Sequence, residues 1–361
     1  MAKFSEVLSI TNGKNQRKVE NPNGRYPIYG SGGIMGYADD YLCDAETVII
    51  GRKGSINKPI FVEEPFWNVD TAFGLVANRS VLLPKYLFYF CIYFDFEQLN
   101  TTVTIPSLTK ANLLNIEMKL PSLIVQQGIV ERLSKVDELI ALRKEQLIKL
   151  DKLVKSRFIE LFGTIHDNKF GYEIKTLQDV CEQIKDGTHQ TPTYTDDSVN
   201  GYKFLSSKDV TTGKIDWAHL KYIPEELHNE LYARIAPRKG DILLAKNGTT
   251  GIAAIVDRDE IFDIYVSLAL LRPIEMKSVY LWAAINSVET KQQFDSSLKG
   301  IGVPNLHLGE IKKAKIIVPP MGEQKRFAAF VEQTDKSKLA IQQSLTKLEL
   351  LKKSLMQEYF G

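Results

Sequence analysis

The sequence predicts an α+β protein. Two β-rich globular domains are separated by two long antiparallel coiled-coil helices, and an internal repeat implies pseudo-twofold symmetry. Three observations predict this fold class. The two helical segments repeat without a gap, each carries a hydrophobic stripe of coiled-coil period, and the segments before them share strand and turn patterns. Of the 361 residues, 44% are hydrophobic and 25% charged, so sizeable cores are expected.

The repeat emerges when residues 105–163 are aligned with residues 303–361. Fourteen of the 59 aligned pairs are identical, among them Gln126 with Gln324, whereas roughly 6% identity is expected by chance. The chain therefore runs domain, helix, domain, helix. The predicted segments are 1–105, 106–163, 164–302 and 303–361.

The globular segments match more weakly. Residues 47–55 and 241–249 both begin as an apolar strand and run into a polar turn that contains a glycine. Residues 84–87 and 278–281 both resemble the start of a short helix. We therefore expect one architecture in both domains, with divergent loops.

The first helical segment is apolar at eight of ten positions of a 3.5-residue stripe, interrupted only by Arg143 and Arg157. Gly163 stands where a left-handed cap would end the helix, after roughly 38 residues or about 57 Å. The second stripe is interrupted elsewhere, by Thr334, Lys338 and Lys352. Two non-identical stripes favour pairing with each other over self-pairing. The alternative is that each helix packs on its own domain.

Charge and composition restrict the function. The net charge of +2 is low for a protein that relies on phosphate neutralisation. The two helical segments are the basic part of the chain, and both globular segments are slightly acidic. No run of ~18 apolar residues is present, so a soluble cytoplasmic protein is expected. Three scattered cysteines are expected to be reduced thiols packed in cores.

The motifs of common catalytic sites are missing. There is no glycine-rich dinucleotide or P-loop motif, no metalloprotease helix motif and no paired cysteine motif. The five histidines are dispersed and form no ligand cluster. The sequence therefore predicts a chain that is not catalytic by itself and holds neither a cofactor nor a metal.

Two sets of segments carry a resemblance that covers essentially the whole chain in order. The first set precedes the long helices, at 104–110, 120–126, 302–306 and 318–324, and the second lies in the globular domains, at 26–33, 50–55, 67–73, 186–192 and 239–244. The first set resembles the helix entry of the DNA-specificity (S) subunits of type I restriction–modification enzymes. The second set is similar to two groups of target-recognition domains of the same family.

This resemblance implies a division of labour. Two target-recognition domains each read one half of a split site in double-stranded DNA. The helices fix their separation and dock two methyltransferase (M) subunits, which bind S-adenosylmethionine and methylate adenine. Motor-endonuclease (R) subunits join to cleave unmodified DNA. Because these partners supply phosphate contacts, the low net charge of this chain is compatible with DNA binding.

In the first domain, Arg52, Lys53 and Ser55 are candidate DNA-binding residues. Arginine can pair with guanine O6 and N7, and lysine and serine can hold a phosphate or a base edge. The alternative is a solvated hairpin turn. Tyr29, Ser31 and Lys110 are weaker candidates, for which loop packing is the default.

In the second domain, Lys246, Asn247 and Thr249 occupy the matching turn, and asparagine can pair with adenine. The alternative is an Asn-Gly type I′ turn. A polar cluster forms a further candidate loop on the strength of the resemblance: Thr188, His189, Gln190 and Thr191. Since Arg52 and Lys246 are interpreted as surface turn residues, replacing either with alanine is expected to leave the fold intact.

Two rival functions remain open. One is an adaptor whose coiled coil links two ligand-binding domains without DNA. The other is a nuclease or methyltransferase with a hidden site, and methyl transfer by the purified chain would identify it. The DNA sequence recognised cannot be derived, because base readout depends on side-chain placement and DNA deformation.

Overall fold

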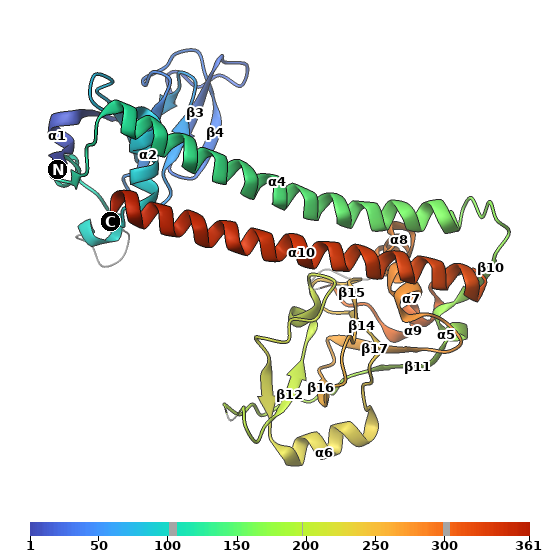
Figure 1. Cartoon of the computed structure of the whole chain (residues 1–361). Helices are drawn as coiled ribbons and strands as arrows, with labels where there is room; N and C mark the ends of the chain where they lie inside the picture. Colours follow the sequence, from blue (N-terminus) through green and yellow to red (C-terminus); the bar gives the residue numbers. More distant parts are fainter. Residues whose placement is uncertain (101–106, 197, 299–303) are drawn as a thin grey trace. The chain divides into compact units, whose positions relative to one another are not determined.

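A computed structural model describes residues 1–100, 107–196, 198–298 and 304–361. The chain divides into two compact units: unit 1 is Met1–Gln146 with Ile341–Gly361, and unit 2 is Leu147–Ala340. Two helices of 40 residues, α4 (Leu123–Phe162) and α10 (Met321–Phe360), each contribute to both units (Figure 1). The domain edges predicted at 105/106 and 302/303 fall outside the described residues.

Unit 1 contains a four-stranded, a three-stranded and a two-stranded sheet. The four-stranded sheet has the order β2 (Leu8–Asn12), β8 (Ala72–Ala77), β5 (Thr47–Gly51), β6 (Ile60–Val62). The others are β4 (Gly33–Ala38), β3 (Tyr26–Gly30), β7 (Trp67–Asn68), and β1 (Ala2–Lys3) with β9 (Glu117–Met118). The helices besides the long ones are α1 (Phe4–Val7), α2 (Pro84–Tyr93), the 3-10 turn Phe96–Leu99 and α3 (Lys110–Leu114).

Unit 2 repeats this order of strands. Its four-stranded sheet is β11 (Cys181–Asp186), β17 (Leu268–Pro273), β14 (Ile242–Ala245), β15 (Ala253–Ile255). The others are β13 (Lys221–Ile223), β12 (Tyr202–Leu205), β16 (Phe262–Ile264), and β10 (Glu173–Thr176) with β18 (Lys315–Val318). Its helices are α5 (Leu177–Val180), the 3-10 turn Ser207–Val210, α6 (Glu225–Arg234), α7 (Ser278–Ile285), α8 (Val288–Ser297) and α9 (Leu308–Lys313). The expected common architecture, including the strands before both turns and the short helices at 84 and 278, is present.

A buried glutamine explains one identity of the repeat. Gln126 and Gln324 are at most 2% exposed, and a buried amide is costly unless it is hydrogen-bonded. The Gln126 Oε1 accepts from the backbone nitrogen of Leu83 at 2.8 Å, just before α2. The Gln324 Oε1 accepts from Lys277 at 3.0 Å, just before α7. In each unit, therefore, this side chain fixes the start of a short helix against a long one.

Each long helix packs into the core of both units. In unit 1, α4 contributes Leu133 and α10 contributes Phe360, whose ring lies 5.1 Å from that of Tyr86. In unit 2, Phe162 of α4 lies 4.9 Å from the ring of Tyr280. The paired phenylalanines of the repeat thus close the two cores in the same way. The alternative, that a helix packs on its own domain, describes only half of each helix.

Within each unit the long helices run in opposite directions. In unit 1, Lys352 lies 2.6 Å from Asp137, and Lys144, further along α4, lies 3.6 Å from Glu349. In unit 2, Lys338 lies 2.7 Å from Asp151. Two of the polar interruptions of the second stripe are therefore ion-paired across to α4.

The predicted end of the first helix is confirmed. Gly163 has a φ of 72°, in the left-handed region, and its nitrogen donates to the carbonyl oxygen of Ile159 at 2.7 Å. Among the helices of the described residues, none is both long and apolar enough to cross a membrane.

The thiols of Cys43, Cys91 and Cys181 are free and buried, as the sequence predicts. Burial raises the pKa of Cys43 and of Cys181 to about 12, and raises that of Cys91 as well. Since the thiolate is the reactive form, alkylation at pH 8 should be slower in the native chain than in the unfolded chain, on the order of a thousandfold. Mass spectrometry after timed alkylation measures this ratio. A cysteine modified equally fast in both states would contradict the burial.

Candidate nucleic-acid interface

Unit 1 gathers four of the predicted polar residues where β3 and β5 end. A side-chain carbon at Gly51 would lie 3.0 Å from the Cβ of Ser31 and 2.4 Å from the carbonyl oxygen of Ser55. The next two residues, Arg52 and Lys53, are exposed. Ser31, Arg52, Lys53 and Ser55 therefore share one surface, which we call the unit 1 turn surface.

Backbone hydrogen bonds fix the position of Arg52. Its nitrogen donates to the carbonyl oxygen of Thr71 at 2.8 Å, and its own carbonyl accepts from Leu108 at 2.9 Å. The guanidinium carbon lies 5.8 Å from the ring centroid of Phe73 and forms no ion pair with any residue that the structure describes. Its donors are thus available to a base edge or a phosphate.

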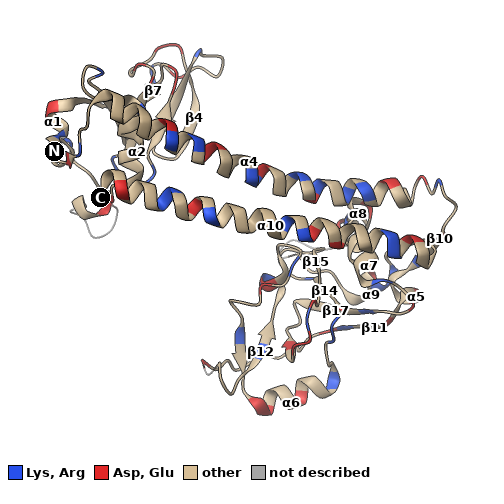
Figure 2. Ribbon diagram, in the orientation of Figure 1, with Lys and Arg blue, Asp and Glu red and all other residues tan. Residues whose placement is uncertain are grey.

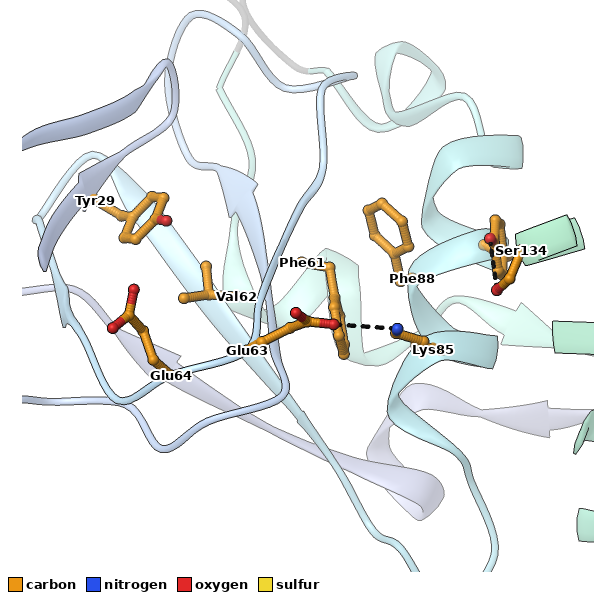
Figure 3. A pocket seen from close by; sticks show the side chains of 9 residues that line it. Tyr29, Phe61, Val62, Glu63, Glu64, Lys85, Phe88 and Ser134 are labelled. Atoms are coloured by element: carbon orange, nitrogen blue, oxygen red, sulfur yellow. Dashed lines mark hydrogen bonds and ion pairs between the residues drawn. The ribbon is translucent and has the colours of Figure 1, made fainter. Parts of the chain in front are cut away.

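Tyr29, the penultimate residue of β3, is half-buried. Its ring packs 5.5 Å from that of Phe66 and lines a pocket of about 480 Å³ (Figure 3). Burial, and then the charge of Glu64, raises the pKa of Tyr29, so the phenol stays protonated at neutral pH. The same pocket holds Glu63, which is paired with Lys85 at 3.1 Å. Since Lys85 compensates Glu63, the carboxylate of Glu64 leaves the lining of this pocket negatively charged, which disfavours an approaching phosphate.

Lys110 begins α3 and is exposed, but its ammonium is engaged. Its Nζ donates to the carbonyl oxygen of Ile10 in β2 at 2.8 Å. This bond attaches the start of α3 to the four-stranded sheet of unit 1, which we call its central sheet, and it agrees with the packing alternative considered for this residue.

Unit 2 brings its two predicted segments together around one carboxylate. Asp186 Oδ2 lies 3.2 Å from the Nζ of Lys246 and 3.1 Å from the Nε2 of His189. The side chain of Lys246 is only 6% exposed and that of Asp186 15%. Lys246 is therefore not the exposed turn residue that the sequence predicted. Its replacement by alanine should destabilise the fold, because a buried carboxylate would lose its partner.

The loop after β11 is exposed at three of its four predicted residues. Thr188 is buried, its nitrogen donates to the carbonyl oxygen of Ile264 at 3.1 Å, and its Oγ1 accepts from the nitrogen of Gln190 at 3.2 Å. His189, Gln190 and Thr191 are exposed. Thr188 thus supports the loop, and the other three side chains are accessible to a ligand.

The turn after β14 is not the two-residue turn considered from the sequence. A type I′ turn needs a positive φ at both central residues. Gly248 has one, at 76°, but Asn247 does not. Thr249 is exposed, whereas Asn247 is half-buried and its Oδ1 has no hydrogen-bond partner among the described residues.

Three exposed basic residues that no sequence motif marked as candidates, Lys14, Arg17 and Lys18, lie in the loop after β2. The backbone nitrogen of Lys14 donates to the carbonyl oxygen of Asn68 in β7 at 2.8 Å. In unit 2, the backbone nitrogen of Thr188 makes the equivalent bond to Ile264 in β16. The glycines that precede them, Gly13 and Gly187, offered a signal. At either one, a side chain would meet a backbone oxygen within about 2 Å.

Comparison with known proteins places the chain in a family. The family model described as type I restriction modification DNA specificity domain matches residues 1–152 and 170–352. The chain belongs to this family, whose members are the DNA-specificity subunits of type I restriction–modification enzymes.

One relative is the specificity subunit of the type I restriction enzyme MjaVIII of Methanocaldococcus jannaschii. It is 26% identical over 334 residues, which are 87% of this chain and 75% of the relative. The crystal structure of the S subunit from M. genitalium is similar in fold, with a TM-score of 0.60, 16% identity, and coverage of 100% and 95%. A chain from a study of complex assembly in the type I restriction–modification system has a TM-score of 0.63, 18% identity, and coverage of 99% and 96%.

Proposed function

We propose that this DNA-specificity subunit reads a bipartite site, with one half-site for each unit, and performs no chemistry itself. Both units have the same strand order, yet they present different polar residues at matching loops. Two domains that bind different half-sites need different contact residues, and they can present these on the same scaffold.

We also infer that α4 and α10 form an antiparallel coiled coil, and that a pseudo-twofold axis relates the two repeats. In each unit an ion pair joins α10 to α4, Lys352 with Asp137 in unit 1 and Lys338 with Asp151 in unit 2, which supports the pairing of the two helices. All ten stripe positions of α4 are buried or half-buried, which supports the seam. The domains would be 1–105 and 164–302, and the helical spacers 106–163 and 303–361.

The partners are proposed from the family. A structure of similar fold belongs to a study of type I complex assembly. We expect two methyltransferase subunits, which would bind S-adenosylmethionine, and motor-endonuclease subunits, in the cytoplasm. Lysine and arginine are spread along both long helices (Figure 2), and partner subunits would supply further phosphate contacts.

A gel-shift assay tests the function. The complex of this chain with its methyltransferase partners should bind selected DNA sites about a thousandfold or more tightly than random DNA at physiological salt. The rival adaptor function predicts no sequence preference at any salt concentration.

Replacing Arg52 with alanine should weaken binding to the unit 1 half-site by about tenfold and leave the melting temperature unchanged, because the guanidinium is exposed. Titration of matched DNAs measures the affinity. Arg79→Ala is the control, since Arg79 is also an exposed arginine of unit 1 but is ion-paired to Glu46. Equal affinity of the Arg52 variant and the native chain would assign Arg52 to a solvated turn.

A further inference from the structure

The first strand of each unit's central sheet ends at an equivalent residue. Asn12 lies opposite Phe73 at the end of β2, and Asp186 lies opposite Ala269 at the end of β11. Since β2 and β11 hold the same place in the strand order, Asn12 and Asp186 are structural counterparts.

Arg52 and Lys246 are counterparts as well, because their backbones make the same bonds. The carbonyl of Arg52 accepts from Leu108 at 2.9 Å, and that of Lys246 accepts from Leu306 at 2.7 Å. Leu108 and Leu306 are an identical pair of the repeat. Both cations therefore extend from the same point of the fold.

Their side chains differ in exposure. Lys246 is buried against the carboxylate of Asp186, whereas Arg52 is exposed, and Asn12, with a neutral and likewise exposed amide, stands at the position equivalent to Asp186. An ion pair compensates the desolvation of a buried ammonium, and an amide cannot do so to the same degree. The unit with an aspartate at the end of the first strand thus has a buried cation, and the unit with an asparagine there has an exposed one.

Asp186 also contacts the loop that follows it, residues 187–191, and its backbone is bound by helix α6. The Oδ2 of Asp186 contacts the Nε2 of His189, and Arg234 at the end of α6 donates to the carbonyl oxygens of Asp186 at 2.7 Å and Gly187 at 2.6 Å. Helix α6 is in turn attached to β16 through His228, whose Nδ1 lies 2.7 Å from Asp263. Residues 39–46, which follow β4 in unit 1, form no such helix.

We propose that Asp186 is a positioning residue. It holds Lys246 away from DNA and fixes the loop 187–191, so that unit 2 reads its half-site through His189, Gln190 and Thr191. In unit 1, Asn12 leaves Arg52 free to contact DNA. This inference rests on the proposed function, and it assigns different contact segments to the two units.

The first test uses the whole chain with its methyltransferase partners and DNAs altered in one half-site at a time. The double variant Asp186→Asn with Lys246→Met removes both buried charges, so it should melt near the native chain. We expect about a tenfold loss of discrimination at the unit 2 half-site and none at the other. Asp216→Asn is the control. Asp216 pairs with a histidine three residues later, His219, as Asp186 pairs with His189, but Asp216 has no lysine partner among the described residues.

Salt dependence separates positioning from contact. Loss of a phosphate contact would reduce the salt slope of the affinity by about one, whereas a positioning residue leaves it unchanged. A double variant with native discrimination, or one with a reduced slope, would overturn the proposal. If the native complex selects no DNA sequence, the proposed function itself fails, whatever the variants do.

The second test adds the ion pair to unit 1. Asn12→Asp should draw Arg52 into a pair and weaken the unit 1 half-site by about tenfold, as Arg52→Ala does. Adding Arg52→Ala to Asn12→Asp should cause no further loss. Asn12→Ser, which carries no charge, should bind normally. Native affinity of Asn12→Asp, or additive losses in the double variant, would contradict the proposed role of this position.

Discussion

A chain with one extra heptad in each long helix is expected to select a DNA site whose spacer is longer by about three base pairs, with both half-sites unchanged. Seven residues lengthen a helix by about 10 Å and preserve the 3.5-residue register. At ~3.4 Å per base pair, this length corresponds to three base pairs. Insertion after Leu147 and after Leu345 places the heptad at an identical pair of the repeat.

The spacer preference would be measured by methylation of a DNA library with variable spacers. A heptad inserted into α4 alone is the control. It displaces ion pairs such as Lys338 with Asp151, so the chain should lose stability without acquiring a new spacer. If a folded and active chain with both insertions kept the original spacer, helix length would not set the spacer, and the helices would serve only as a docking surface for partner subunits.

Exchange of residues 164–302 for the equivalent segment of a relative should change one half-site completely and leave the other as it was. The core of unit 2 that supports its sheets is built largely from this segment, and α4 and α10 contribute buried aromatic residues such as Phe162 and Phe327. A donor that keeps a tyrosine at the place of Tyr280 should therefore dock correctly.

Methylation motifs before and after the exchange measure the effect. The reciprocal exchange of residues 1–105 is the matched control and should change only the other half-site. If one exchange altered both halves, the units would not be independent readers, and the modular reading of the repeat would be wrong.

Features that depend on local sequence could be predicted. The extent of the first helix, its end at Gly163 and the strands before both turns follow from hydrophobic period and glycine placement, which act over a few residues. The identity of Gln126 and Gln324 was visible in the repeat, but its reason was not. Each amide binds a backbone some 45 residues away, and no local pattern records such a contact.

The candidate site was predictable only in part. Arg52 and Lys53 are exposed and lie close to the half-buried Ser31. The burial of Lys246 could not be read from its turn, because its partner Asp186 lies 60 residues earlier in the chain. Tyr29 was selected with a glycine-rich turn, yet its ring packs against Phe66 and lines a pocket. Residues near a predicted turn share its location but not always the direction of their side chains.

If two units of one architecture read two unlike halves of one DNA site, the methylation pattern of the host genome must show it. Genome-wide methylation profiling of a host that carries this chain and its methyltransferase partners should find methylated adenines in a single motif. That motif should consist of two short specific sequences that flank a non-specific spacer of fixed length. A continuous motif, two identical half-sites, or methylation without any sequence preference would contradict the reading of two unlike half-sites by two units.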